Sequence, residues 1–148
     1  MLRDPNLIPL SHQHQHALAL CVQLDRSLQA GTADLEALQA QIRTMFNLEI
    51  RWHFAAEEEA LFPPAAAFAE LQPLVEELLR QHASLREYFT RAERRELDAA
   101  TLREFAQLLS AHIRKEEREL FEACQRLFPA EKLKEVGAAL DAALHRLP

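Results

Sequence analysis

The feature that most constrains the fold is a helical repeat that runs without interruption from residue 101 to residue 128. Core-type positions recur there at every third or fourth residue, which is the period of one face of an α-helix. They are Leu102, Phe105, Leu109, His112, Glu116, Leu120, Ala123 and Leu127. A stripe of this length predicts one long helix that buries its inner face against other helices.

The rest of the chain has the same helical character. It contains only two glycines, β-branched residues are scarce, and no long segment alternates at period two, so strands are not expected. Capping residues and helix breakers mark the ends: Gly31, Thr32 or Asp34, Pro63 and Pro64, Pro73, Asp98 or Thr101, and Pro129. We therefore predict helices over residues 9–30, 34–62, 73–94, 98–128 and 130–145, with a short helical turn within 65–70.

Four long helices with short links predict an all-α, up-down-up-down four-helix bundle with a short additional C-terminal helix. A chain of 148 residues fits one domain and is long enough to bury a core. We expect a single domain over residues 1–148, with the core bundle at about 9–128 and the C-terminal helix at about 130–145.

Composition argues against several classes of protein. No apolar run approaches the roughly 20 residues that cross a bilayer, and the N-terminus lacks the apolar segment of a signal peptide, so we expect a cytoplasmic protein. The net charge of −6 argues against nucleic-acid binding. Cys21 and Cys124 adjoin apolar stripes, so we predict that both are buried thiols. Motifs of hydrolases, kinases and thioredoxins are missing from the sequence.

Titratable side chains occupy positions on the predicted inner faces where burial is most costly. His53 continues the apolar stripe of the second helix, and Glu57 follows one turn later. His112 and Glu116 repeat this pattern on the fourth helix. On the third helix, His82 lies within the inner face that Leu74, Leu78, Leu85 and Phe89 mark.

The first helix offers three histidines in the stretch SHQHQHALAL. In a helix, alternate residues lie about 200° apart, so His12, His14 and His16 cannot converge on one point. His14 extends the stripe of Ala17, Cys21, Leu24 and Leu28, whereas His12 and His16 lie together on the opposite side. We select His14 and keep the other two as alternatives.

The predicted interior therefore holds four histidines and two carboxylates, one histidine on each long helix. Unpaired, such groups would each cost several kcal/mol. They could hydrogen-bond to one another in a polar layer, or they could bind metal. Six such residues on four facing helices favour metal binding, and imidazole with carboxylate suits iron, manganese or zinc.

The two motifs HFAAEEEALF and AHIRKEERELF, with LSHQHQHALAL and LLRQHASL, make the chain resemble the hemerythrin-like (HHE cation-binding) domain family over about residues 10–128. The resemblance implies a four-helix bundle that holds a non-haem di-iron centre with carboxylate and oxo or hydroxo bridges. Carried over by position, the terminal ligands would be His14, His53, His82 and His112, and the bridging carboxylates Glu57 and Glu116.

Arg86 distinguishes this chain from the oxygen-carrying members of that family. Those members have a second histidine one turn after the third-helix ligand, and Arg86 stands at that place here. One metal would then have an open position, a water, or a substitute ligand such as Glu58 or Glu117. The spacing in the oxygen carriers would select Glu117 instead of Glu116, whereas helical phase favours Glu116.

We therefore expect a di-iron protein for sensing or redox handling of oxygen or nitric oxide, or for iron handling, and not for oxygen transport. Any enzymatic activity would be a weak oxidase- or peroxidase-type reaction. The alternative is a regulatory or interaction bundle with a single structural zinc or no metal. The expected partner is a small diatomic ligand, with neither nucleic acid nor membrane, and the sequence does not specify a protein partner.

Overall fold

The computed structural model describes residues 2–31 and 33–145, and these form helices and short connections without strands. The α-helices are α1 (Ile8–Gln29), α2 (Leu35–Met45), α3 (Arg51–Ala56), α4 (Phe62–Ala66), α5 (Gln72–Glu93), α6 (Ala99–Lys115), α7 (Phe121–Leu127) and α8 (Ala130–Leu144). Three π-helical turns join some of them without a break: η1 (Phe46–Ile50), η2 (Glu57–Leu61) and η4 (Glu116–Leu120). A 3₁₀ turn, η3 (Ala69–Leu71), precedes α5.

The helix starts follow from the capping residues. Asp34 accepts a hydrogen bond from the Ala37 N–H and begins α2. Asp98 and Thr101 form a capping box at the start of α6. After α1, Gly31 has φ +70°, a left-handed conformation that ends the helix and that glycine adopts without strain. Of the alternative caps, Asp34 and Asp98 are used, and Thr32 lies outside the described residues.

Pro63 and Pro64 do not end the second helical segment as predicted. They lie in the first turn of α4, which carries the segment on to Ala66. A proline is tolerated in a first turn because the N–H that it lacks would have no carbonyl partner there. The other predicted helices agree with the observed bounds within one or two residues.

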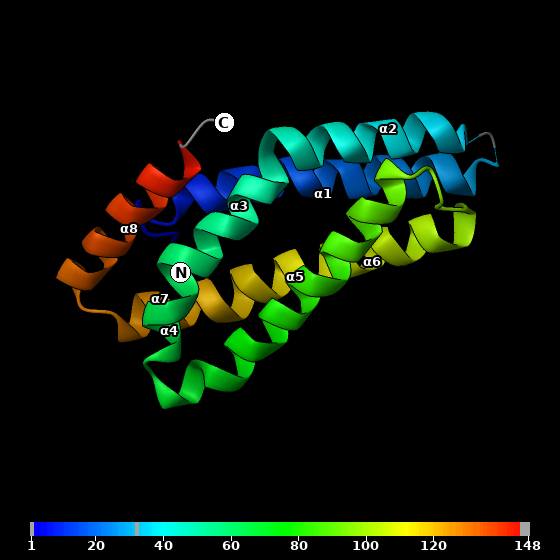
Figure 1. Cartoon of the computed structure of the whole chain (residues 1–148). Coiled ribbons are helices and arrows are strands. Elements are labelled where there is room, and N and C mark those ends of the chain that lie inside the picture. Colours follow the sequence, from blue (N-terminus) through cyan, green and yellow to red (C-terminus); the bar gives the residue numbers. More distant parts are fainter. Residues whose placement is uncertain (1, 32, 146–148) are drawn as a thin grey trace.

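The long helical segments pack as a helical bundle (Figure 1). α1 lies along α6, α2 packs against α5, and α5 packs against α6. α8 lies at one end of the molecule, against α3 and η2 (Figure 1). The short C-terminal helix that the sequence predicts therefore packs at one end of the bundle.

The buried apolar side chains form two clusters. The α8-side cluster includes Leu10, Leu61, Leu78, Leu120 and Leu140. The α2-side cluster includes Leu24, Ile42, Leu85, Phe105 and Leu109. Cys21 belongs to the α2-side cluster and Cys124 to the α8-side cluster, and burial raises the pKa of each thiol to about 12.

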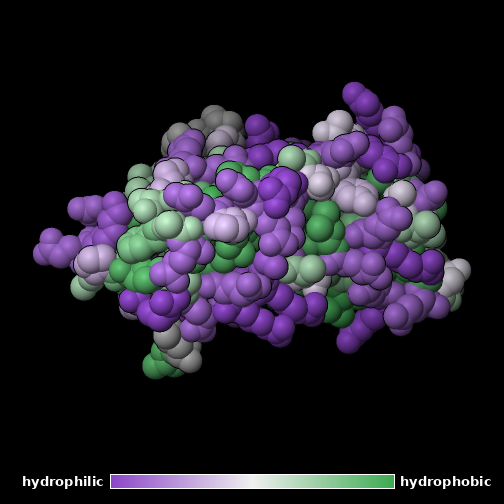
Figure 2. All heavy atoms as spheres, turned by 90° about the horizontal axis from the view of Figure 1, so that it is seen from below, coloured by the Kyte–Doolittle hydropathy of each residue, from purple (hydrophilic) through white to green (hydrophobic). Residues whose placement is uncertain are grey.

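The face of the molecule in Figure 2 is mostly hydrophilic, with scattered small apolar patches. Among the described helices, none has the length and apolarity that crossing a membrane requires.

Candidate metal centre

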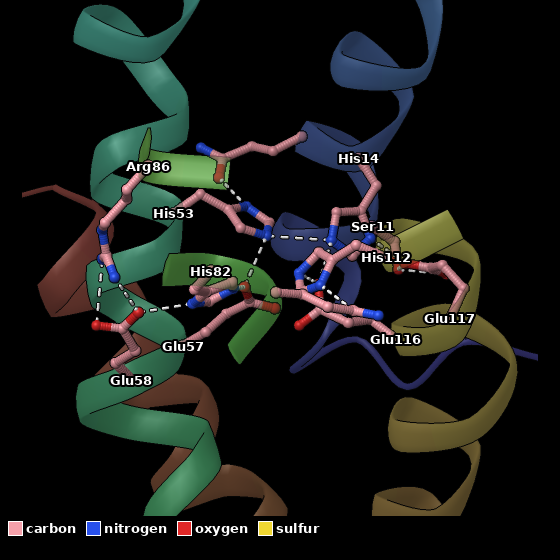
Figure 3. Close-up of polar contacts among 12 residues, drawn as sticks. Ser11, His14, His53, Glu57, Glu58, His82, Arg86, His112, Glu116 and Glu117 are labelled. Carbon is pink, nitrogen blue, oxygen red and sulfur yellow. Dashed lines mark hydrogen bonds and ion pairs between the residues drawn. The ribbon is translucent and has the colours of Figure 1, made fainter. Parts of the chain in front are cut away.

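The structure brings the six sequence-predicted residues together in the interior. One histidine comes from each of α1, α3, α5 and α6, and one glutamate from the first residue of each of η2 and η4. All six side chains are buried, and they point toward a common centre (Figure 3): His14, His53, Glu57, His82, His112 and Glu116. His12 and His16, the alternatives to His14, are exposed.

The six residues form a polar layer between the two apolar clusters. On α1, Leu10 belongs to the α8-side cluster and Ala17 to the α2-side cluster, with His14 between them. On α5, Leu78 and Leu85 flank the site histidine in the same way. The apolar residues on both sides exclude water from the layer, so its polar groups depend on one another or on a bound ion.

Two of the imidazoles are held from behind by carboxylates. Glu117 Oε2 lies 2.6 Å from His14 Nδ1, and Glu58 Oε2 lies 2.6 Å from His82 Nδ1. A carboxylate oxygen only accepts hydrogen bonds, so in both imidazoles Nδ1 donates and carries the hydrogen. The other ring nitrogen, Nε2, then faces the centre of the layer (Figure 3).

The other two imidazoles are held by glutamine amides. Gln13 Oε1 lies 2.7 Å from His53 Nδ1, and Gln81 Oε1 lies 2.7 Å from His112 Nδ1. An amide oxygen also only accepts, so Nδ1 is again the donor. All four histidines therefore carry a hydrogen on Nδ1 and present Nε2 inward, and Nε2 is the nitrogen that would bind a metal ion once it carries no proton.

The inward atoms lie close together. Glu116 Oε1 is 3.1 Å from His14 Nε2 and 3.2 Å from His112 Nε2. Glu57 Oε1 is 3.4 Å from His53 Nε2 and 3.3 Å from His82 Nε2. The atoms fall into two groups, each within 4.8 Å and both containing the two glutamates: His14, His53, Glu57 and Glu116, and Glu57, His82, His112 and Glu116.

Several of these atoms have no hydrogen-bond partner among the described residues. They are both oxygens of Glu57, Glu116 Oε2, and Nε2 of His82 and His112. A buried polar atom without a partner costs several kcal/mol. Metal ions would use these lone pairs, and the donor set of imidazole and carboxylate suits iron, manganese or zinc. The residues present therefore fit a pair of metal ions that share two carboxylates.

The pKa values show how the layer distributes protons without metal. Burial lowers the pKa of His14, but the hydrogen bonds and charges of Glu116 and Glu117 outweigh it and raise the value to about 9. Burial lowers the pKa of His53 well below its usual value and also lowers that of His82. These shifts leave His14 as a cation and His53 and His82 neutral near pH 7.

The pKa values of the two central glutamates are shifted in opposite directions although both side chains are buried. Burial, reinforced by the nearby charge of Glu116, raises the pKa of Glu57 well above its usual value. Burial also acts to raise the pKa of Glu116, but the charge and hydrogen bonds of His112 and His14 lower it well below the usual range. Glu57 therefore keeps its proton to a higher pH than Glu116 does.

Glu58 and Arg86 form one contact network at the edge of the site. Arg86 donates to both carboxylate oxygens of Glu58, at 2.7 and 3.1 Å, so its guanidinium does not enter the layer (Figure 3). Burial acts to raise the pKa of Glu58, but the hydrogen bonds of His82 and Arg86 lower it to about 2. Glu58 lies behind His82, outside both four-residue groups.

Glu117 occupies the corresponding place behind His14. Ser11 Oγ donates to it at 2.7 Å, and Arg3 forms an ion pair with it at 3.2 Å. Glu117 also lies outside both groups, whereas Glu116 belongs to each. The choice of Glu116 from helical phase therefore agrees with the position of that carboxylate.

Sequence reasoning missed the outer contacts of the histidines. Gln13 and Gln81 had not been identified, although each directly precedes a predicted site histidine. The dipeptide Gln-His occurs at Gln13-His14, Gln15-His16 and Gln81-His82, so it was a signal only together with the inner-face positions of His14 and His82. Ser11 and Arg3 left no such signal, because their role depends on the packing of the N-terminal segment.

A small cavity of about 10 Å³ adjoins the layer. Much of its lining is apolar, with Ala17, Ile50, Phe54, Leu109 and Ile113 beside His14, His53 and His112. Such a volume holds about one molecule of the size of water. The site therefore has room for a very small ligand and not for an organic substrate.

The chain is similar to a known family of proteins. A family model described as the hemerythrin HHE cation binding domain matches residues 9–124, a range that contains all six inward-facing residues. No curated protein and no solved structure matches the chain significantly.

Proposed function

The chain belongs to the hemerythrin HHE cation-binding family, and we propose on this basis that its buried layer holds a di-iron centre. The observation that carries the proposal is the pair of four-residue groups that share Glu57 and Glu116. Each group offers two imidazoles and two carboxylates. Glu57 and Glu116 would be shared by the two ions. His14 and His53 would hold one ion, and His82 and His112 would hold the other.

The donor set favours iron over a single structural zinc. Zinc in structural sites is typically closed by four ligands, often with cysteine. Cys21 and Cys124 lie in the apolar clusters, outside both groups. Two overlapping groups support a two-metal centre, and a mixed set of imidazole and carboxylate suits iron. Manganese is chemically compatible with the same ligands.

A pair of iron ions held here would supply redox chemistry and coordination positions for a diatomic ligand. The residues of the chain orient four Nε2 lone pairs toward the ions and keep bulk water away with the two apolar clusters. The small apolar cavity beside His14 and His53 has a size that favours oxygen or nitric oxide over larger molecules.

We propose that this centre serves sensing or redox handling of oxygen or nitric oxide, or iron handling, and not oxygen transport. The support is Arg86, which stands where oxygen carriers have a further histidine and is ion-paired to Glu58. Each metal position would then have two nitrogen ligands, so one of them has fewer than in an oxygen carrier. We expect such a centre to be oxidised by oxygen and not to release it unchanged.

The bundle itself is proposed to run up-down-up-down as a single domain over residues 1–148. Support comes from the short connections between the long helical segments, such as residues 94–98 between α5 and α6. The packing of α1 along α6 agrees with this order.

The first test is metal analysis of protein from iron-replete cells, purified with and without air. We expect about two irons per chain, and Glu57→Ala and His112→Ala should each lose most of that iron while they remain helical. One zinc per chain would favour the structural alternative. Metal at trace level only would contradict the proposal.

The second test separates a reactive or sensory centre from a carrier. The iron-loaded protein is reduced without oxygen, exposed to oxygen, and returned to an oxygen-free atmosphere while its absorption spectrum is followed. We expect the oxidised spectrum to persist until a reductant is added. A full and repeatable return of the reduced spectrum on removal of oxygen alone would identify a carrier.

A further inference from the structure

The site contains an internal repeat that extends beyond the inward-facing residues. The first half of the bundle, residues 8–66, contains Gln13-His14 and His53-x-x-x-Glu57-Glu58. The second half, residues 72–127, contains Gln81-His82 and His112-x-x-x-Glu116-Glu117. Each half thus supplies two histidines, one inward glutamate, one glutamine and one further glutamate.

The two kinds of outer residue act in different ways. Each glutamine holds a histidine of its own half: Gln13 accepts from His53, and Gln81 accepts from His112. The further glutamates cross between the halves, because Glu58 accepts from a histidine of the second half and Glu117 from a histidine of the first. Each four-residue group therefore contains one histidine backed by an amide and one backed by a carboxylate.

The crossing carboxylates are fixed on their outer sides. Arg86 binds both oxygens of Glu58, and its guanidinium also stacks 5.5 Å from the centre of the Phe54 ring. Glu117 is held by Ser11 Oγ and Arg3. Both glutamates are only partly exposed, at 27% and 26% of their side chains. Two carboxylates anchored in this way cannot turn toward the centre without loss of several hydrogen bonds.

We propose that Glu58 and Glu117 are positioning residues of the metal centre and not ligands of it. This inference rests on the proposed function. Each carboxylate fixes the Nδ1–H tautomer of a histidine from the opposite half, and Arg86 or Arg3 with Ser11 fixes the carboxylate. The two halves thereby complete each other, since neither can orient all its own imidazoles.

The chemical effect of such a carboxylate is known in general terms. It orients the ring and increases the electron-donating strength of Nε2, and loss of such a contact typically lowers metal affinity by about 10–100-fold. A neutral amide at the same place would keep the hydrogen bond but not the charge. His53 and His112, which have amides already, are the built-in comparison within the same site.

The test uses the full chain with Co²⁺ as an optical probe, in wild type, Glu58→Gln, Glu58→Ala and the corresponding variants of Glu117. Exposed Glu76 on α5 provides the matched control, because Glu76→Gln removes one negative charge from the same helix that carries His82. Circular dichroism confirms that each variant is helical. Competition with a chelator gives the affinity, and the visible Co²⁺ bands report the coordination.

We expect two Co²⁺ per chain in all variants, with affinity lowered about 10–100-fold in the alanine variants and less in the glutamine variants. The Co²⁺ bands should keep their shape, and Glu76→Gln should match wild type. In NMR spectra of the Co²⁺ protein, the exchangeable Nδ1–H signal of His82 should broaden in Glu58→Ala, because water then replaces the carboxylate.

Other outcomes would overturn the inference in distinguishable ways. Loss of one Co²⁺ per chain, with a changed band pattern, in Glu58→Ala or Glu117→Ala would show that these residues are ligands. Unchanged affinity and an unchanged Nδ1–H signal would show that they form surface ion pairs only. Wild type that binds neither Co²⁺ nor iron would contradict the proposed function as well.

Discussion

At the scale of single residues, Glu57 is the group whose surroundings are least compatible with a metal-free interior. Its side chain is fully buried, neither oxygen has a hydrogen-bond partner within the described part of the chain, and Glu116 lies close by. Burial and this neighbouring charge raise its pKa. Burial of this carboxyl group lowers the stability of the metal-free fold. We therefore infer that Glu57 serves another role, namely metal binding.

We predict that Glu57→Gln makes the metal-free protein more stable and abolishes tight metal binding. Because the folded-state pKa of Glu57 is raised, the folded protein binds this proton more tightly than the unfolded chain, and stability falls as the pH rises above the ordinary value of about 4.3. The neutral amide removes this loss. The gain, on the order of 1 kcal/mol, should be larger at pH 8 than at pH 5.

Urea unfolding of the chelated wild type and variant at both pH values measures this gain. Gln39→Ala, which removes a buried polar group outside the site, serves as a control that should destabilise at both pH values. An equal or lower stability of Glu57→Gln at pH 8 would contradict the prediction.

The raised pKa of His14 leads us to predict a second pH dependence of the stability of the metal-free protein. Its folded-state pKa of about 9 exceeds the ordinary 6.5, so its contribution to stability is complete below about pH 6.5 and is lost as the pH rises through 9. One pKa unit corresponds to about 1.4 kcal/mol, so the loss is on the order of a few kcal/mol. The raised pKa of Glu57 acts in the same direction.

The measurement is the free energy of unfolding of chelated protein between pH 6.5 and pH 9. His14→Gln should reduce the slope without removing it, since Glu57 remains. A slope identical to that of wild type would show that His14 is not the titrating group. His16→Gln is the matched control, because this histidine lies on the same helix but is exposed.

At the scale of helices, two π-helical turns coincide with the glutamate pairs. η2 begins at Glu57 and η4 at Glu116, so in each case the widened turn starts at the inward carboxylate. Isolated π-helical turns within α-helices occur frequently at functional sites. Because η2 and η4 occur at equivalent positions in both halves of the bundle, we associate these two π-helical turns with the polar layer.

The contact between α8 and the N-terminal segment gives a prediction at the same scale. A Cβ at Gly137 would collide with the side chain of Asn6. Asn6 is held by Asp4 Oδ1, which accepts hydrogen bonds from the backbone N–H and from the side-chain amide of Asn6. Gly137→Ala should therefore destabilise the protein by about 1–3 kcal/mol, although alanine is the better helix former by about 1 kcal/mol.

Thermal or urea unfolding measures the effect of Gly137→Ala. Lys134→Ala, an exposed change on the same helix, should stay within about 0.5 kcal/mol of wild type. A more stable Gly137→Ala variant would show that the N-terminal segment does not pack on α8 as described.

At the scale of the whole molecule, metal binding should link the four long helical segments. Each of two ions at about a hundred times its Kd would add roughly 2.7 kcal/mol of stability. In a chain of this size 1 kcal/mol shifts Tm by about 2–4 °C. Complete chelation should therefore lower Tm by roughly 10–20 °C.

Calorimetry before and after chelation, with iron restored in a third sample, checks this expectation. Recovery of the original Tm on reloading serves as the control for damage by the chelator. A Tm that does not change after verified removal of metal would place the ion outside the layer between the two apolar clusters.

The sequence by itself determined the helices and the inner face of each one. Caps such as Asp34 and Asp98, the glycine after α1 and the three-four spacing of apolar residues act within one or two turns, so local reading recovers them. The same periodicity identified the six residues that the structure buries in one layer. The local prediction was wrong at Pro63 and Pro64. These prolines lie in the first turn of α4, so the helical segment continues through them and does not end there.

Only the tertiary structure decided which atoms of those residues meet. The contacts of His14 with Glu117 and of His53 with Gln13 join residues 103 and 40 positions apart. They depend on how the helices are rotated and shifted against one another, and this arrangement results from packing of all the side chains together. Helical phase can therefore place a histidine on an inner face, but packing alone assigns the acceptor behind it.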